Sequence, residues 1–362
     1  MKLGIDGLKF PDARKLGPLG ILTKAHDAGL SGVFFRTILD LSPTLDTGEL
    51  RRAQDTADEY GMYLEAGLGK VNPYALPETP EIRAIGDGDT VLGFRRMMEA
   101  SATIDCRELW VATASHKPYP GRFAYDRFRS DISWTDQLIA IEKLLMKLAP
   151  IARDLGIHLN LETHEEITSF ELVRLVEAVG PDVTGITFDT ANVLQRAEHP
   201  VWAAKRVAPY VRQTHIKDAG LFRDPEGLLF QMRPNGGGMV NLEHILPILA
   251  DANPDVNLSL EIRQVPSNPA RPSPTRSLIS IHDPHWIDGH PDLTAEELLA
   301  FMHLVQQFEQ RLESGEIPTH AAYGAAPFGV EEAWNYITES VQYVQDAAAT
   351  TGVALTTAAG AL

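Results

Sequence analysis

The sequence has 362 residues, of which 44% are hydrophobic, an ordinary share for a chain that buries a sizeable core. Its formal charge of −17 argues against nucleic-acid binding, because phosphate contacts need clustered lysine and arginine. A single cysteine, Cys106, excludes an intramolecular disulfide and indicates a reducing compartment. The polar N-terminal segment does not resemble a signal peptide, and no apolar run is long enough to span a bilayer, so we expect a cytoplasmic protein without membrane contact.

Strand-like and helix-like runs alternate eight times, and several joints pass from a glycine directly into an apolar strand. We expect strands at Lys2–Asp6, Gly32–Arg36, Met62–Gly67, Leu109–Ala114, Ile157–Glu165, Thr184–Asp189, Val211–Lys217 and Val256–Arg263. We expect helices at Ile21–Ala28, Leu50–Tyr60, Val91–Thr103, Thr135–Leu155, Phe170–Val179, Val193–Ala208, Leu242–Leu249 and Leu293–Leu312.

Strict alternation of strand and helix implies parallel strands, and eight such units favour a closed barrel over an open doubly wound sheet. No GxGxxG follows the first strand, so a dinucleotide-binding sheet has no support. We therefore predict an α/β protein with a catalytic (β/α)8 TIM barrel over residues 1–312. Residues 313–362 are expected to form an extension with a helix at Val330–Ala348 and a disordered, low-complexity tail.

Three connections are too long to be simple joints: Gly69–Thr90, His116–Trp134 and Gln264–Asp292. All three follow strands, so they lie on the catalytic face of a barrel, where long loops shape the substrate pocket. The last of them carries His282 and Trp286, which we consider substrate-binding candidates. The alternative is a surface insertion with no role.

Four of the expected strands end in residues that bind metals. Glu162 and His164 close the fifth strand, two residues apart and therefore on one face. Asp189, His215 and Glu261 close the sixth, seventh and eighth strands in turn. One acid at a strand end is usually a cap or a salt-bridge partner, but such residues in four successive strands indicate a single site.

Two glutamates, an aspartate and a histidine offer hard oxygen ligands and one imidazole, a set that suits one divalent ion. We expect Mn²⁺ first, with Mg²⁺, Co²⁺ or Zn²⁺ as alternatives. Such an ion would polarise a substrate carbonyl and stabilise the enediolate that forms when the neighbouring C–H is deprotonated. Glu162 and Glu261, one on each side of the substrate, would then serve as base and acid.

The strand-end series resembles the xylose isomerase-like TIM barrels, a superfamily of sugar isomerases, ketose 3-epimerases, inosose dehydratases and endonuclease IV. The resemblance covers the barrel and implies that the metal ligands are Glu162, Asp189, His215 and Glu261. HIKD at His215–Asp218 matches the family's pattern. GGGMVNLEHIL at Gly236–Leu246 resembles its GxGxVD stretch, with Asn241 where Asp is usual.

Departures from this family narrow the choice. Endonuclease IV uses three metals and more histidines. Strands three and four of this chain, LEAGLG and WVATAS, supply none of the extra metal ligands. Xylose isomerase proper has a second metal site and a Lys-rich motif where this chain has LETHEE. Ketose 3-epimerases usually follow the strand-five Glu with Pro or a small residue, unlike His164 here.

A histidine two positions after the metal-binding Glu is similar to the catalytic subunits of bacterial C-glycoside deglycosidases. The resemblance implies C–C cleavage of a 3-oxo-C-glycoside, with His164 as general base or acid because imidazole titrates near neutral pH. It also implies a small β-sandwich partner subunit. The loops at His116–Trp134 and Gln264–Asp292 would suit a flat polyphenol aglycone and this partner, and we expect an oligomer.

Further polar residues are candidates for binding a sugar or glycoside substrate. Arg263 lies two residues past Glu261 and so on the same face, where it would bind a substrate oxygen or an oxyanion. Each candidate also has a structural explanation, a salt bridge for a cation or a helix N-cap for Asn192. The full set of substrate-binding candidates is Arg263, Arg36, Lys217, Asn192, His282 and Trp286.

Two other functions remain open at this point. One is a ketose 3-epimerase, sugar isomerase or inosose dehydratase-like enzyme, which would act on a free ketose or cyclitol. The other is a sugar-binding or regulatory barrel that has lost catalysis, although the intact set of four ligands speaks against it.

Overall fold

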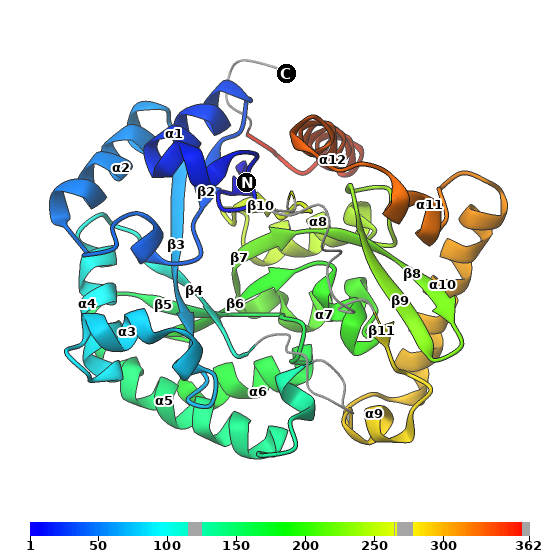
Figure 1. The fold of residues 1–362 in the computed structure, drawn as a ribbon, viewed down its shortest axis with the longest axis horizontal. Coiled ribbons are helices and arrows are strands. Elements are labelled where there is room, and N and C mark those ends of the chain that lie inside the picture. The colour runs from blue at the N-terminus through cyan, green and yellow to red at the C-terminus, as the bar shows by residue number, and fades with distance from the viewer. Residues whose placement is uncertain (115–124, 264, 266–277, 357–362) are drawn as a thin grey trace.

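The computed structural model describes residues 1–114, 125–263, 265 and 278–356. Its centre is a closed barrel of eight parallel strands in the order β1-β10-β7-β6-β5-β4-β3-β2. Helices surround this barrel, as Figure 1 shows in a view along the barrel. The predicted (β/α)8 TIM barrel is therefore confirmed.

The barrel strands are short and almost entirely buried. They are β1 (Leu3–Asp6), β2 (Gly32–Phe34), β3 (Tyr63–Lys70), β4 (Glu108–Ala112), β5 (His158–Glu162), β6 (Thr184–Asp189), β7 (Val211–Ile216) and β10 (Leu258–Leu260). The eighth expected strand is shorter than predicted, because β10 ends at Leu260. Glu261 and Arg263 therefore follow the strand, and the two-residue alternation of a strand no longer fixes where Arg263 points.

Most of the helices bury one apolar face. The helices are α1 (Ala13–Asp27), α2 (Thr47–Glu59), α3 (Pro80–Ile85), α4 (Thr90–Ala102), α5 (Trp134–Leu155), α6 (Ser169–Val179), α7 (Pro200–Val207), α8 (Leu242–Ala252), α9 (Pro284–Asp288), α10 (Ala295–Glu313), α11 (His320–Ala325) and α12 (Val330–Thr351). In the part of the chain that the structure describes, no helix combines the length and apolarity needed to cross a bilayer.

The helix expected at Val193–Ala208 is two separate elements. A 3₁₀ segment covers Asn192–Arg196 and ends at Ala197, which has a left-handed φ of 56°. The α-helix begins only at Pro200, because a proline disfavours helical angles in the residue before it. His199 accordingly has extended angles and its Nδ1 accepts a hydrogen bond from the amide of Val201.

An antiparallel hairpin that the sequence alternation does not include follows β7. Its strands are β8 (Asp218–Asp224) and β9 (Gly227–Arg233), and β11 (Leu278–Ile279) pairs with β9 from the other side. Gly227 has a φ of 151°, which a side chain would strain, so the turn in DPEG requires glycine. The hairpin projects beside α10 and α11 (Figure 1).

The start of β8 is fixed by Asp218, the last residue of the HIKD motif. Its two carboxylate oxygens accept backbone N–H bonds from the glycine-rich turn at Gly236 and Gly238, at 3.0 and 2.9 Å, and from Val240 at 2.9 Å. A Cβ on Gly238 would lie 2.1 Å from Asp218 Oδ1, so glycine is required there. The two matched motifs thus form one structural unit beside the barrel mouth.

The C-terminal segment packs on its own barrel. Helix α12 contacts α8 and buries one apolar face, which includes Ile337, Val341 and Val344. Thr356 then forms a parallel bridge with Lys2, so the ordered chain extends further than expected. Residues 357–362 of the predicted disordered tail lie outside the described residues.

Candidate metal centre

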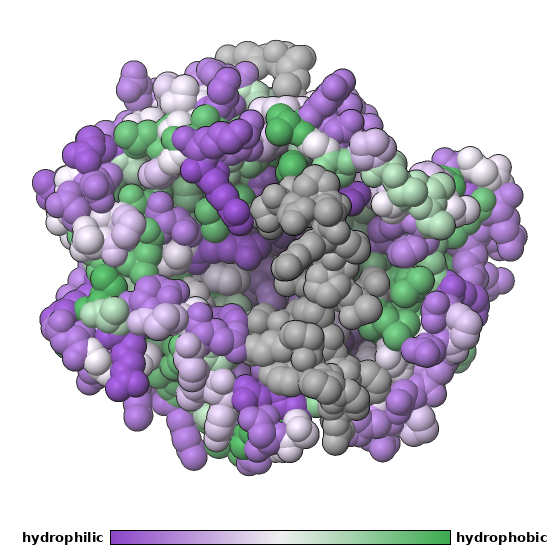
Figure 2. Space-filling view, viewed as in Figure 1, coloured by the Kyte–Doolittle hydropathy of each residue, from purple (hydrophilic) through white to green (hydrophobic). Residues whose placement is uncertain are grey.

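Four strand-end side chains meet at one end of the barrel: Glu162, Asp189, His215 and Glu261. Each offers one ligand atom, and these atoms all lie within 4.8 Å of one another. The strand register brings them together, since Asp189 pairs with His215 and His215 with Ser259, two residues before Glu261. Figure 2 shows a hydrophilic hollow near the middle of the molecule in the same view.

Glu162 is held in place by two neighbours. Trp110 Nε1 donates to Glu162 Oε2 at 3.0 Å, and His215 Nδ1 lies 2.9 Å from Glu162 Oε1. Burial alone would raise the pKa of Glu162, but the charged forms of His164 and His215 hold it well below its usual range. Glu162 is therefore an ionised, fixed carboxylate.

Asp189 directs one oxygen into the cluster. Its Oδ1 accepts the backbone N–H groups of Ala191 and Asn192 at 2.9 and 2.8 Å, in the turn that follows β6. Its Oδ2 lies 2.8 Å from Lys217 Nζ. Lys217 is buried, and its ammonium also lies 3.1 Å from both Glu261 Oε2 and Asn192 Oδ1. The structure thus places two predicted substrate contacts, Lys217 and Asn192, next to the metal-ligand set.

Glu261 is surrounded by cations. Besides Lys217, Lys9 Nζ makes a close ion pair with Glu261 Oε1, and Arg36 Nη2 lies 3.7 Å from the same oxygen. Arg36 also lies 3.6 Å from Asp6, a buried acid at the end of β1. Burial, and then the charges of Arg36 and Lys217, lower the pKa of Lys9 well below its usual range.

Lys9 and Asp6 are site residues that the sequence analysis missed. The stretch GIDGLKF carries a signal of the kind used elsewhere, an acid that ends a strand with a cation soon after.

The donor set fits a divalent cation. His215 Nε2 is a buried atom that makes no hydrogen bond within the described ranges. Such atoms are uncommon in folded proteins, and a cation bound to this nitrogen would satisfy it. Three carboxylates and an imidazole supply oxygen and nitrogen ligands in the proportion that first-row divalent metals accept.

His164 lies at the edge of this cluster and is held by its own carboxylate. Its Nδ1 is 2.6 Å from Glu166 Oε2, and its Nε2 is 3.7 Å from Glu162 Oε2. Glu166 is fully buried, and its other oxygen accepts a hydrogen bond from Thr113 Oγ1 at 2.6 Å. Burial alone would lower the pKa of His164. The charges of Glu166 and Glu162 outweigh this effect and raise the pKa to about 9.

Aromatic rings form one wall of the cluster. The Phe34 ring lies 4.6 Å from the His215 imidazole, and the Trp110 ring lies 6.0 Å from Phe34. Both rings are buried. Because an apolar wall excludes water, it strengthens the electrostatic interactions of the charged groups beside it.

The remaining predicted contacts do not join the cluster. Trp286 is only 1% exposed and stacks on His290 at 3.7 Å, so it packs in the core. His282 is exposed on the segment before α9. Arg263 makes no ion pair among the described residues, and its guanidinium lies over the Phe328 ring at 4.5 Å.

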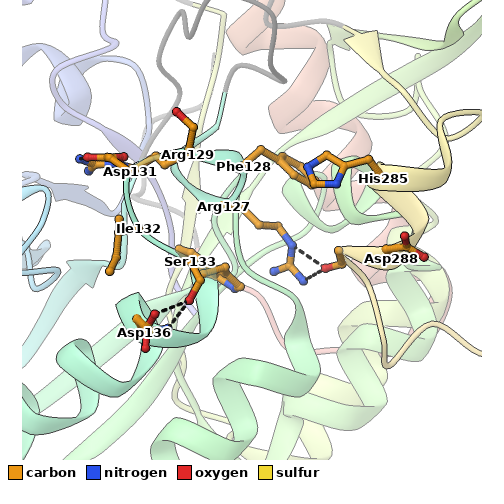
Figure 3. Close-up of a pocket in the computed structure, with 12 residues that line it drawn as sticks. Arg127, Phe128, Arg129, Asp131, Ile132, Ser133, Asp136, His285 and Asp288 are labelled. Atoms are coloured by element: carbon orange, nitrogen blue, oxygen red, sulfur yellow. Dashed lines mark hydrogen bonds and ion pairs between the residues drawn. The ribbon is translucent and has the colours of Figure 1, made fainter.

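The two long aromatic loops do meet, as far as the structure describes them. Arg127 Nε donates to the carbonyl of Gly289 at 2.9 Å, and the rings of Phe128 and His285 lie 5.9 Å apart. Between the loops is an open pocket of about 540 Å³, drawn in Figure 3. Residues 115–124, 264 and 266–277 of these loops lie outside the described residues.

Two known proteins match part of this chain. The uncharacterized protein YihM of Escherichia coli is 32% identical over 135 residues, which span 36% of this chain and 41% of that protein. The 3-oxo-isoapionate decarboxylase of Pectobacterium atrosepticum is 25% identical over 229 residues, 62% of this chain and 70% of the relative. The chain thus matches less than half the length of YihM.

Solved structures show the same fold. The D-psicose 3-epimerase of Clostridium cellulolyticum H10 superposes with a TM-score of 0.57 at 16% identity, covering 85% of this chain and 99% of that one. At this identity the likeness concerns the fold alone. The model of one family, the xylose isomerase-like TIM barrels, matches residues 22–281, well over half of the sequence. The chain therefore belongs to the xylose isomerase-like TIM barrel family.

Proposed function

We propose that this protein is a divalent-metal-dependent enzyme that removes a proton from the carbon next to a sugar carbonyl. The observation that carries the proposal is the position of His164. Its Nε2 lies 3.7 Å from Glu162 Oε2 at the edge of the metal-binding cluster, while Glu166 holds its Nδ1. A base beside a cation site is the arrangement that this proton transfer needs.

The ion is held by the four clustered side chains, and Mn²⁺ is the first choice. When bound, it supplies a positive charge that polarises the substrate carbonyl and so makes the neighbouring proton more acidic. The ligands are Glu162, Asp189, His215 and Glu261.

His164 is the proposed general base. Its Nδ1–H donates to Glu166, and loss of the Nε2 proton, which a bound cation would favour, leaves a lone pair on the nitrogen nearer to Glu162. Thr113 fixes the carboxylate of Glu166 from its other side. The imidazole therefore has a defined orientation before the substrate arrives, which lowers the entropy lost in reaching the transition state.

The specific reaction that we propose is C–C cleavage of a 3-oxo-C-glycoside. His164 takes the proton from C2, next to the 3-oxo carbon. The released electron pair forms the C1–C2 double bond while the bond from C1 to the aglycone breaks. The aglycone carbon leaves with the bonding pair and takes a proton from the protein or from solvent. The relative named 3-oxo-isoapionate decarboxylase supports a substrate with a 3-oxo group.

A second candidate is a sugar epimerase, isomerase or inosose dehydratase-like enzyme. It is favoured by the positions of Glu162 and Glu261, whose oxygens lie 2.9 and 3.5 Å from the same atom, His215 Nδ1. Two carboxylates that flank one point are suited to act as an acid–base pair on opposite sides of a carbon. His164 would then position the substrate.

One assay separates these functions. The Mn²⁺-loaded protein is incubated with a 3-oxo-C-glucoside and, separately, with free ketoses, and both aglycone release and sugar isomers are followed. Aglycone release that chelation and His164→Ala both abolish is the expected result. Ketose interconversion without aglycone release would move the protein to the second candidate. Metal-dependent binding of sugars without any turnover would indicate a barrel that has lost catalysis.

The assay also bears on the proposed partner. Turnover by the purified chain alone would show that a small β-sandwich subunit is not required.

A further inference from the structure

Two arginines outside the metal cluster converge on one tyrosine ring. The guanidinium carbon of Arg233, at the end of β9, lies 3.9 Å from the Tyr323 ring centre, and that of Arg263 lies 5.9 Å from it. The guanidinium carbon of Arg263 also lies over a second ring, that of Phe328, at 4.5 Å from its centre. Tyr323 and Phe328 belong to the C-terminal segment, beyond the residues that the family model matches.

Neither arginine pairs with a carboxylate within the ranges that the structure describes. Arg233 Nη2 donates to Gln231 Oε1 at 2.7 Å and to the carbonyl of Pro318 at 3.0 Å, both uncharged acceptors. Arg233 is 2% exposed, and its buried Nε has no hydrogen-bond partner. Arg263 is half-buried, and its contacts among the described residues are with the two rings and with the Tyr323 hydroxyl, to which it is hydrogen-bonded.

Stacking leaves available those N–H donors of Arg263 that are not bonded to Tyr323. An aromatic ring contacts the flat face of a guanidinium, whereas its N–H groups point outward in the plane. The edge of Arg263 can therefore bind two oxygens of a carboxylate or phosphate at once. The rings of Phe328 and Tyr323 hold this edge in a fixed orientation.

Arg127, by contrast, is a buried arginine that does pair with an acid. Arg127 is equally buried, but its Nη1 lies 2.8 Å from Glu171 Oε2 in an ordinary ion pair. Arg196 is another buried arginine without an ion pair among the described residues, but it lies beside His290, whereas Arg233 and Arg263 lie close to each other. Burial lowers the pKa of Arg233, Tyr323 and Tyr336 oppose this effect, and the charge of Arg263 lowers the pKa again, because the two guanidinium groups repel each other.

The arginines lie close to the metal centre along the chain. Arg263 is two residues past Glu261, so their backbones are at most about 7 Å apart. Arg233 is brought close to the same part of the chain by the hairpin, in which it pairs with Asp218, the residue after Lys217.

We propose that Arg263 and Arg233, with the rings of Tyr323 and Phe328, form a subsite for an oxyanion carried by the substrate, a carboxylate or a phosphate. The inference rests on the proposed function and narrows its substrate to acidic sugar derivatives. In the C-glycoside reaction, the charged group belongs to the part of the molecule that is remote from the reacting carbon.

Binding of simple probes tests the subsite without turnover. Inorganic phosphate, D-glucuronate and neutral D-glucose are titrated into the full-length protein by calorimetry, with Mn²⁺ and again with excess EDTA. We expect phosphate, glucuronate or both to bind more tightly than glucose in both conditions. Binding that persists in EDTA excludes direct coordination of the anion to the metal, and the stronger of the two anions identifies the group.

Substitutions locate the binding. We expect Arg263→Met to raise the dissociation constant of the preferred anion about tenfold or more, because the loss of a charged hydrogen bond typically has an effect of this size. Arg263→Lys keeps the positive charge but loses the planar pair of N–H donors that can bind two oxygens at once. We therefore expect this variant to retain only part of the affinity for the anion. Arg153→Met is the matched control, because Arg153 is exposed and pairs with Asp182 on another face. Because Arg233 is buried, the anion affinity of Arg233→Met is interpreted only if this variant has the same thermal unfolding temperature as the wild type.

Two results would overturn the subsite. One is equal binding of glucose and both anions, and the other is an unchanged anion affinity in Arg263→Met. Either result would leave the proposed proton transfer intact, because that reaction is followed separately through aglycone release and its dependence on His164.

Discussion

His164 Nδ1 lies 2.6 Å from Glu166 Oε2, and this contact defines what the imidazole can do. Glu166 is buried and braced by Thr113, so it restrains both the ring orientation and the proton on Nδ1. The nitrogen that remains, Nε2, is the one nearer to Glu162. His164 is therefore bound on one side to a fixed carboxylate and turned on the other toward the metal-ligand set.

The first prediction concerns Glu166 as the residue that positions His164. Glu166→Gln keeps the size of the side chain but removes the carboxylate, so the tautomer and orientation of His164 are no longer fixed. We expect kcat for aglycone release to fall about 10- to 100-fold, as for other carboxylates that orient a catalytic or metal-bound histidine, with little change in KM. Steady-state kinetics of the Mn²⁺-loaded variant measures this.

The neighbouring Glu165→Gln is the control for this prediction. Its side chain is half-buried and is not hydrogen-bonded to His164 in the structure, so its kcat should stay close to that of the wild type. An undiminished kcat in Glu166→Gln would show that the imidazole needs no such support.

The second prediction concerns the metal. Mn²⁺ at a hundredfold excess over its Kd should raise the free energy of unfolding by about 3 kcal/mol, because it binds the folded chain alone. Asp189→Asn removes the charge of the oxygen that lies beside Lys217, so the increase should be largely lost. Thermal unfolding with Mn²⁺ and with EDTA measures it. Asp182→Asn, an exposed position before the same strand, should keep the full increase.

The third prediction concerns Lys217, whose ammonium lies 2.8 Å from Asp189 and 3.1 Å from Glu261. In Lys217→Met the metal-free protein keeps buried carboxylates without this cation, which should lower its free energy of unfolding by about 3–5 kcal/mol. Mn²⁺ should restore part of the loss, since it neutralises the same oxygens. Chemical denaturation with and without Mn²⁺ measures both effects.

The exposed Lys143→Met serves as the control for charge removal alone and should unfold like the wild type. Equal stability of metal-free Lys217→Met and wild type would mean that other cations, such as Lys9, already balance the cluster.

The ligand cluster could be predicted from sequence because its signal is local. Glu162 and Asp189 each follow a short apolar run, and a strand buried in a barrel has little reason to end in an acid unless the acid is used. Parallel strands then carry such ends to the same side without any knowledge of contacts. The barrel itself followed from the same alternation, which repeats often enough to outweigh errors at single boundaries.

Long-range packing decided what the sequence did not reveal. Trp286 is an aromatic residue in a long loop, a pattern typical of substrate pockets, yet it is buried against His290 and Arg196. The hairpin of β8 and β9 breaks the alternation, and its position depends on Asp218 binding the distant glycine turn. Arg263 turns to Phe328 because β10 ends early, which strand periodicity alone does not predict.

The last prediction concerns pH and Glu65, a buried residue of β3 on the opposite side from the metal centre. Asn257 Nδ2 donates to Glu65 Oε1 at 2.7 Å. Burial raises the pKa of Glu65 to about 7, and the charge of Glu108 adds to the increase although the bond from Asn257 opposes it. The folded protein therefore holds this proton up to about pH 7, whereas the unfolded chain releases it near pH 4.

Because the folded state binds the extra proton, the contribution of Glu65 to stability is complete at low pH and is lost as pH rises toward 7. Glu65→Gln removes the titration but keeps an oxygen for Asn257. The variant should match the wild type near pH 4 and exceed it above pH 7 by on the order of 2–3 kcal/mol in free energy of unfolding. Urea denaturation at a series of pH values measures this difference, and a difference that does not change with pH would show that Glu65 is ionised in the folded barrel.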